Sequence, residues 1–177
     1  MSSQNELVVI VDEDNREVGV AGRGVMRRFN LPHRATYVLI LNGKGEVFVH
    51  KRTKTKDIYP GYHCPAVGGV VAAGETYEQS AIRELREETG IRDVALTQLF
   101  DFYHRDRGNK VWGRAFACRW AGPLVLQEEE VESGSFMSLA AVLNLAEEEP
   151  FTPDGLYVLE RYAAEKGLLK GPGDIPQ

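Results

Sequence analysis

Three glutamates that a single helix would place close together, Glu84, Glu87 and Glu88, are the residues of this chain best suited to chemistry. At the helical rotation of about 100° per residue, their spacings of i, i+3 and i+4 place them within an arc of about 100°. Like charges at such spacings repel, so they do little to stabilise a helix. A divalent cation would remove that repulsion, and Mg²⁺ binds carboxylates together with substrate phosphates. The spacing therefore predicts a cation site.

A second interpretation of the same segment is a solvent-exposed helix laced with ion pairs. Arg83 precedes Glu87 by four residues, a spacing at which opposite charges attract on a helix surface. Taken alone, residues 83–88 favour neither interpretation over the other.

The residues around the glutamates follow one fixed pattern that favours the cation site. Over residues 69–91 the order is G-x5-E-x7-R-E-U-x-E-E-x-G-U, in which U is a bulky aliphatic residue. Glu75 and Arg83 are the first acidic and the basic member, and Leu85 and Ile91 fill the aliphatic positions. This pattern resembles the Nudix box at every defined position, so the chain is similar to the Nudix hydrolase superfamily.

The resemblance implies a fold, an activity and a cofactor. The implied fold is an α/β/α sandwich with a mixed β-sheet. The implied activity is hydrolysis of the diphosphate linkage in a nucleoside diphosphate derivative or a related organic diphosphate, with Mg²⁺, or Mn²⁺ as a substitute, as cofactor. By position in the box, Glu75 and Arg83 form a structural pair that ties the loop to the helix. The implied metal ligands are Glu84, Glu87, Glu88 and the backbone carbonyl of Gly68.

The expected reaction also requires a group that takes a proton from the attacking water. The box glutamates Glu87 and Glu88 are two candidates, and the acidic segment 127–132 supplies others. Glu130 is favoured among these by resemblance to relatives that carry a glutamate before the last strand. A solvated acidic loop is an equally good interpretation of each glutamate in that segment.

Two further residues are candidates for substrate binding. Arg52, at the end of a predicted strand over 46–52, could hold a phosphate through two parallel hydrogen bonds. Gly69 would let the backbone approach the substrate closely, because glycine lacks a side chain. The alternatives are a surface arginine at a strand end and a simple turn at the glycine.

A helix over residues 76–89 should position the glutamates. Thr76 is a candidate N-cap and Gln79 completes a capping box, while Gly90 suits the left-handed residue that ends the helix. An apolar stripe beside the carboxylates should pack on the core while the carboxylates line a cleft. The members of this stripe are Ala81, Ile82 and Leu85.

Strands and helices are predicted on both sides of this central helix. A β-hairpin spans 6–23, and the later strands and helices are expected at 36–41, 46–52, 94–104, 111–120, 135–138, 139–147 and 153–166. A mixed sheet with helices on both faces follows, which is an α/β sandwich. No repeat or internal linker interrupts the sequence. We therefore expect one domain over 1–177, with 168–177 as a loose tail.

Composition narrows the class of partner. The net charge of −5 argues against a protein that binds a nucleic-acid backbone and is compatible with a small-molecule diphosphate whose charge a metal neutralises. Cys64 and Cys118 give neither a disulfide framework nor a zinc pattern. No signal peptide and no membrane-spanning stretch are evident, so we expect a cytoplasmic protein. The hairpin could pair across a homodimer.

Segments outside the box resemble the isopentenyl-diphosphate isomerase-like branch of the superfamily, notably 31–38 and 51–61. That resemblance raises isomerase activity as an alternative. The isomerase's catalytic cysteine would fall at Gly68, its neighbouring metal-binding histidine at Val70, and its second acid near 110–112, where no carboxylate occurs. A hydrolase on an isomerase-like scaffold is therefore expected. A nucleotide-binding module without turnover is the third alternative.

Overall fold

The computed structural model of this protein describes residues 3–169. Its strands are β1 (Leu7–Val11), β2 (Glu17–Gly22), β3 (His33–Leu41), β4 (Val47–Arg52), β5 (His63–Cys64), β6 (Thr97–Arg105), β7 (Lys110–Arg119) and β8 (Val131–Met137). Its α-helices are α1 (Arg23–Arg28), α2 (Tyr77–Thr89), α3 (Leu139–Glu148) and α4 (Pro153–Glu165), and a short 3₁₀ helix, η1, spans Ser3–Asn5. None of the helices within residues 3–169 is long and apolar enough to cross a membrane.

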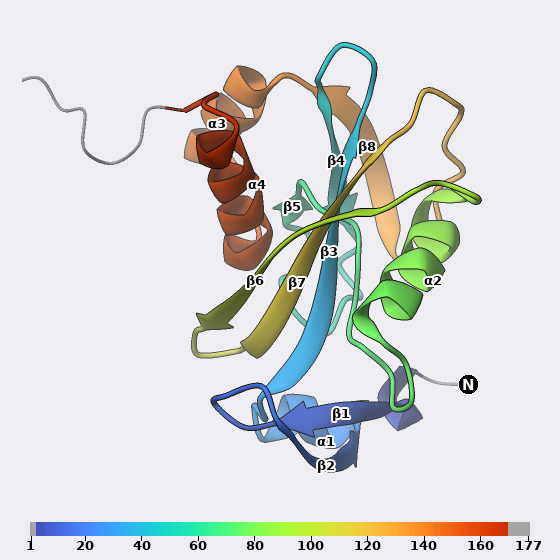
Figure 1. The fold of residues 1–177 in the computed structure, drawn as a ribbon, viewed down its shortest axis with the longest axis vertical. Coiled ribbons are helices and arrows are strands. Elements are labelled where there is room, and N and C mark those ends of the chain that lie inside the picture. The colour runs from blue at the N-terminus through green and yellow to red at the C-terminus, as the bar shows by residue number, and fades with distance from the viewer. Residues whose placement is uncertain (1–2, 170–177) are drawn as a thin grey trace, which may run out of the picture.

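The sheet is mixed and is built around β3, which pairs in parallel with β7 along its whole length. β6 extends the sheet beyond β7 in antiparallel fashion, and β4 and β8 form an antiparallel pair on the other side of β3. The predicted N-terminal hairpin is present as β1 and β2, and it joins β3 through Ile10 and His33. Helix α2 covers one side of the sheet, and α3 and α4 cover the other (Figure 1). The predicted α/β sandwich is thus confirmed.

Both faces of β3 are buried, because consecutive side chains of a strand point to opposite faces. Tyr37 and Leu39 belong to the core beneath α3 and α4, whereas Val38 and Ile40 belong to the core beneath α2. This two-sided burial explains the continuous apolar run over residues 36–41. Because it is packed on both faces, β3 is a rigid support for the adjacent loops.

Helix α2 begins and ends where its local sequence predicts. The Thr76 hydroxyl accepts from the Gln79 amide at 3.2 Å, and the Gln79 side chain accepts from the Thr76 amide at 2.9 Å. Gly90 adopts a left-handed φ of 74° and its amide donates to the Arg86 carbonyl. These contacts satisfy backbone groups that a helix end leaves unpaired.

The orientation of α2 differs from the expectation at one residue of the apolar stripe. Ala81 and Leu85 are buried, but Ile82 is 51% exposed and does not pack on the core. The buried arc of the helix is centred instead close to Glu88, which is only 4% exposed. The rotation of a helix about its axis is set by the sheet against which it packs, and the helix's own sequence contains only part of that information.

The last strand is longer than predicted, because β8 pairs with β4 from Val131 to Met137. The acidic segment therefore leads directly into the sheet. Ser138 caps α3 by accepting from the Ala141 amide at 3.2 Å, as expected. Most of the predicted tail 168–177 lies outside the described residues.

Candidate active site

Arg83 joins the loop of the box to its helix. Its Nε and Nη2 atoms donate to the two carboxylate oxygens of Glu75 at 2.8 and 3.0 Å, and Nη2 also lies 3.5 Å from the Val70 carbonyl. The hydrogen bonds from Arg83 hold the pKa of Glu75 below its usual range. The bidentate contact brings the loop 69–75 against the middle of α2.

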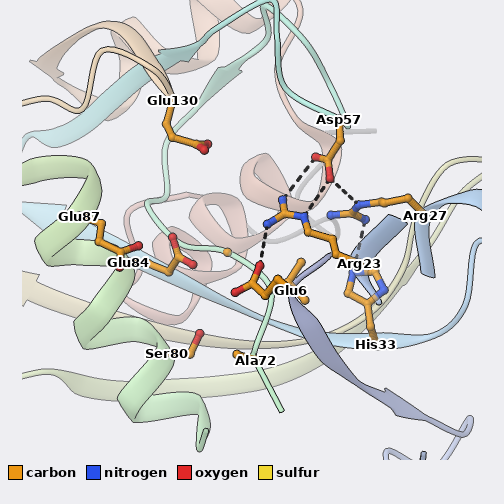
Figure 2. A network of polar contacts seen from close by, with 12 residues as sticks. Glu6, Arg23, Arg27, His33, Asp57, Ala72, Ser80, Glu84, Glu87 and Glu130 are labelled. Carbon is orange, nitrogen blue, oxygen red and sulfur yellow. Dashed lines mark hydrogen bonds and ion pairs between the residues drawn. The ribbon is translucent and has the colours of Figure 1, made fainter. Parts of the chain in front are cut away.

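The three glutamates of the helix occupy three different environments. The Glu84 side chain is 14% exposed, whereas that of Glu87 is 43% exposed. Both accept from Nη1 of Arg83, at 2.7 and 3.3 Å, which offsets their mutual repulsion. Figure 2 shows the carboxylates of Glu84 and Glu87 side by side.

Glu88 is buried, and its Oε2 atom has no hydrogen-bond partner within residues 3–169. Burial and, to a smaller extent, the charge of Glu84 raise the pKa of Glu88 to about 7, although the charges of Lys56 and Arg52 oppose this shift. A buried carboxylate without a partner is costly in its ionised form. A bound cation would remove that cost.

Two glycines allow the loop to lie close to both β3 and the glutamates. A Cβ atom on Gly69 would stand 2.5 Å from Oε1 of Glu84, and one on Gly68 would overlap the Thr36 carbonyl. The Gly69 carbonyl is already used, since it accepts from the Thr36 amide at 2.9 Å. Among the described residues no donor contacts the Gly68 carbonyl, which leaves that oxygen available as a ligand.

Most of the sequence-predicted residues line one cavity of about 530 Å³, which we call the carboxylate cleft. A cleft of this size accommodates a small molecule. Glu88 and Arg52 do not line it. The residues that do are Glu6, Arg23, Lys56, Gly68, Gly69, Arg83, Glu84, Glu87, Gln127 and Glu130.

Glu130 lies across the carboxylate cleft from Glu84 and Glu87 (Figure 2). Its segment is tied to the end of α2, because the Gln127 amide donates to the Glu88 carbonyl at 3.1 Å. Its carboxylate contacts the ammonium of Lys56, whose side chain is 12% exposed. Burial, helped by the charge of Arg52, lowers the pKa of Lys56.

Arg52, a predicted phosphate ligand, does not line the carboxylate cleft. Its Nε and Nη2 atoms both donate to the Ile58 carbonyl, at 3.3 and 2.9 Å. The side chain thereby holds the loop 53–62 and lines a smaller cavity behind the carboxylate cleft. The loop folds back over the end of β4, a tertiary arrangement that the strand pattern does not contain.

Sequence reasoning missed three charged residues of the cleft: Glu6, Arg23 and Lys56. Arg23 donates to Glu6 at 3.3 Å and to Asp57 at 3.0 Å, so it connects the N-terminal hairpin to the loop 53–62 (Figure 2). None of these residues stands in a motif. They can be recognised as residues of the site only in the folded protein, where distant parts of the chain come together.

The donor set of the box fits a hard divalent cation, which prefers oxygen ligands. Glu88 is a buried carboxylate with an orphaned oxygen, Glu84 is a partly buried one, and Glu87 lies on the same helix. Within residues 3–169, no three acidic, histidine or cysteine side chains converge around one point as they stand. Arg83 draws Glu84 and Glu87 toward itself, so cation binding would require these carboxylates to turn.

Comparison with known proteins places the fold and the box in one family. The family model of the NUDIX domain matches residues 31–161. The chain therefore belongs to the Nudix family, and it is a hydrolase by this membership.

Among curated relatives, the uncharacterized Nudix hydrolase PA4841 of Pseudomonas aeruginosa is 40% identical over 91% of this chain and 95% of its own length. The uncharacterized Nudix hydrolase YfcD of Escherichia coli K12 is 40% identical over 89% of this chain and 86% of its own length.

Solved structures share the fold at lower identity. DR0079 from Deinococcus radiodurans superimposes with a TM-score of 0.77 and 22% identity, over 88% of this chain and 98% of its own. The NUDIX domain of Shewanella oneidensis NrtR, solved with ADP ribose, gives a TM-score of 0.60 and 19% identity, over 77% and 88% of the two chains. At these identities the likeness supports the fold alone.

Proposed function

We propose that this protein is a metal-dependent hydrolase of the diphosphate linkage in a nucleoside diphosphate derivative or a related organic diphosphate. The observation that supports this most strongly is the buried, unpaired carboxylate of Glu88 beside the partly buried Glu84. A purely structural helix has no reason to bury that charge. The proposed cofactor is Mg²⁺, with Mn²⁺ as a substitute.

The proposed ligands of the cation are the carboxylates of Glu84, Glu87 and Glu88 and the carbonyl of Gly68. When bound, the cation would neutralise diphosphate charge and lower the pKa of a coordinated water. Glu75 and Arg83 would keep the loop and helix in register through their bidentate contact. Gly69 would allow the substrate to approach the backbone beside Glu84.

Glu130 is the proposed acceptor of the water's proton, because its carboxylate lines the cleft opposite the box glutamates. Before substrate binds, its carboxylate is held by Lys56. Glu87 also lines the cleft and is a second candidate. Glu88 lies behind the cleft wall, which suits a ligand better than a group that exchanges protons with solvent.

The test is turnover of a panel of diphosphates with Mg²⁺, followed by release of nucleoside monophosphate or orthophosphate. Glu87→Gln should abolish turnover while the circular dichroism spectrum is retained. Glu78→Gln is a matched control, since Glu78 is exposed on the same helix and lies outside the cleft. Tight ligand binding without turnover by the unaltered protein would contradict the hydrolase and favour a binding module.

We also propose a small-molecule substrate, a cytoplasmic location and a homodimer. The dimensions of the cleft and the net charge of −5 support a small diphosphate over a nucleic-acid polymer. Cys64 and Cys118 are both free thiols, which suits a reducing compartment. Exposed valines on the edge strand β2 support pairing through the hairpin.

A further inference from the structure

A second and smaller cavity lies directly behind the carboxylate cleft, and we call it the inner cavity. Its volume is about 70 Å³. The two spaces are adjacent, because four residues line both: Arg23, Lys56, Gly68 and Gly69. A ligand long enough to pass the two glycines would have one end in each space.

The inner cavity is lined by four cationic side chains, Arg23, Arg27, Arg52 and Lys56. Carboxylates compensate the positive charges of these four side chains only in part. Asp57 is shared, since it accepts from Arg23 at 3.0 Å and from Arg27 at 3.2 Å. Arg52 donates to a backbone carbonyl and not to a carboxylate.

Arg27 shares its one counter-charge, Asp57, with Arg23. Within residues 3–169 its other side-chain contacts are with neutral groups, Oδ1 of Asn109 at 3.3 Å and Nε2 of His33 at 3.5 Å. Figure 2 shows Arg27 beside His33. Burial lowers the pKa of His33 to about 3, so this ring carries no charge near neutral pH. Burial lowers the pKa of Arg27 as well. An anion in the cavity would supply the missing counter-charge.

The carboxylate that lines the inner cavity, Asp154, does not fill that role. It accepts from the Tyr37 hydroxyl at 2.7 Å, from Nδ2 of Asn109 at 3.3 Å and from the Gly155 amide at 2.9 Å. Both of its oxygens are therefore engaged with neutral donors, and among the described residues Asp154 forms no ion pair with Arg27.

The size and charge of the inner cavity suit a small anion. A space of about 70 Å³ is several times what one water needs, so a phosphoryl group fits it. A free terminal phosphoryl group carries up to two negative charges, one more than a phosphoryl group esterified on both sides. The four cationic side chains therefore favour the free end.

We propose that the inner cavity binds the unsubstituted terminal phosphoryl group of an organic diphosphate monoester, whose other phosphoryl group lies in the carboxylate cleft. This rests on the proposed hydrolase function and narrows it to substrates with a free phosphate end. Diphosphates that are esterified at both ends are disfavoured, because esterification removes a negative charge that the cationic side chains of the inner cavity would bind.

The corresponding reaction is balanced without a further reactant. The oxygen of water bonds to the phosphorus in the carboxylate cleft, and the bond between that phosphorus and the bridging oxygen breaks, leaving its electron pair on the bridging oxygen. The products are then an organic monophosphate and orthophosphate, and the proton of water passes to the general base.

The test compares two adenine nucleotides that differ at the terminal phosphoryl group. This group is free in ADP, whereas in ADP-ribose it is esterified. The unaltered protein should hydrolyse ADP with the higher kcat/KM, by about tenfold or more. Arg27→Gln should raise KM for ADP about tenfold and leave kinetics with ADP-ribose unchanged, as expected for the loss of one charge-assisted contact. Arg28→Gln is the matched control, because it removes a charge from the same helix turn outside the cavity.

A binding measurement separates this proposal from the proposed function. Orthophosphate should bind the unaltered protein in calorimetry, bind Arg27→Gln at least tenfold more weakly, and bind Arg27→Lys with intermediate affinity. If no diphosphate is hydrolysed but this order of phosphate binding holds, the hydrolase function fails and the phosphate site stands. If ADP-ribose is hydrolysed as well as ADP, the terminal-phosphate site is refuted and the hydrolase stands. The comparison of the two substrates needs no variant, so it remains decisive if Arg27→Gln does not fold.

Discussion

At the scale of single residues, Glu88 shows what spacing predicts and what it does not. The i, i+3, i+4 spacing predicts three neighbouring carboxylates, and Glu84 and Glu87 do share one arginine. That Glu88 lies at the centre of the buried arc depends on how α2 rests on the sheet, which no local pattern contains. The unpaired oxygen, and with it the strongest argument for a cation, is visible only in the folded molecule.

A pH dependence follows from Glu88. Its pKa is raised from 4.5 to about 7 on folding, so the folded state binds the proton more tightly than the unfolded state. The protonated form's full contribution to stability is present below pH 4.5 and is lost as the pH rises through about 7. In EDTA, Glu88→Gln should therefore be more stable than the unaltered protein at pH 8, by on the order of 3 kcal/mol, and the difference should vanish near pH 4. Urea unfolding at the two pH values measures this difference in the free energy of unfolding.

The same variant also tests the metal. Mg²⁺ should stabilise the unaltered protein at pH 8 and stabilise Glu88→Gln less, because the variant lacks one ionised ligand. Equal stabilisation of both proteins by Mg²⁺ would place the cation elsewhere.

Gly69 is a residue at which one methyl group should affect the site and spare the fold. In Gly69→Ala the new Cβ would stand 2.5 Å from Oε1 of Glu84, so this carboxylate must move. We expect Mg²⁺ affinity and turnover to fall by roughly tenfold or more, as when the support of a ligand is lost. Gly43→Ala is the control, since its Cβ would meet no atom within 4 Å. Unchanged Mg²⁺ affinity in Gly69→Ala would argue against Glu84 as a ligand.

At the scale of elements, the signals that act within a few residues are the reliable ones. The capping box and Gly90 fix the ends of α2, and Ser138 fixes the start of α3. The extent of β8 depends on its pairing with β4, and the exposure of Ile82 depends on the sheet beneath α2. Both expectations failed for the same reason, because they involve partners distant in the sequence.

The contribution of Arg83, which connects the loop of the box to helix α2, can be tested by substitution. Arg83→Gln removes the bidentate contact with Glu75 and the shared contact with Glu84 and Glu87. Because Arg83 and Glu75 remain about a quarter exposed, we expect a loss of only about 1 kcal/mol in the free energy of unfolding. Arg86→Gln, on the exposed side of the same helix, should lose less. Chemical denaturation without metal distinguishes the two variants.

At the scale of the whole molecule, the carboxylate cleft is assembled from regions that are far apart in the sequence. The N-terminal hairpin region contributes Glu6 and Arg23, the loop after β4 contributes Lys56, and the segment before β8 contributes Glu130. The box could be predicted from sequence, because its residues form one contiguous motif, and Glu130 is expected from its place before the last strand. Glu6, Arg23 and Lys56 could not be predicted, because they meet only through the topology of the sheet (Figure 1).

The proposed homodimer is tested on the outermost strand. Val18 and Val20 on β2 are 63% and 55% exposed, and an edge strand with exposed apolar side chains invites pairing with another strand. Val18→Lys combined with Val20→Lys should convert a dimer to a monomer in sedimentation equilibrium. Val125→Lys is the control, since Val125 is 72% exposed but lies away from β2. A dimer that survives the double change uses another surface.

The ion pairs around Lys56 and Arg23 have a consequence for the order of events during binding. Both cations are already occupied, Lys56 by Glu130 and Arg23 by Glu6 and Asp57. A phosphate that reaches them must exchange places with the protein's own acids. Binding of this phosphate to Lys56 would release the Glu130 side chain. Glu130 would therefore become available as a proton acceptor only when the substrate is bound.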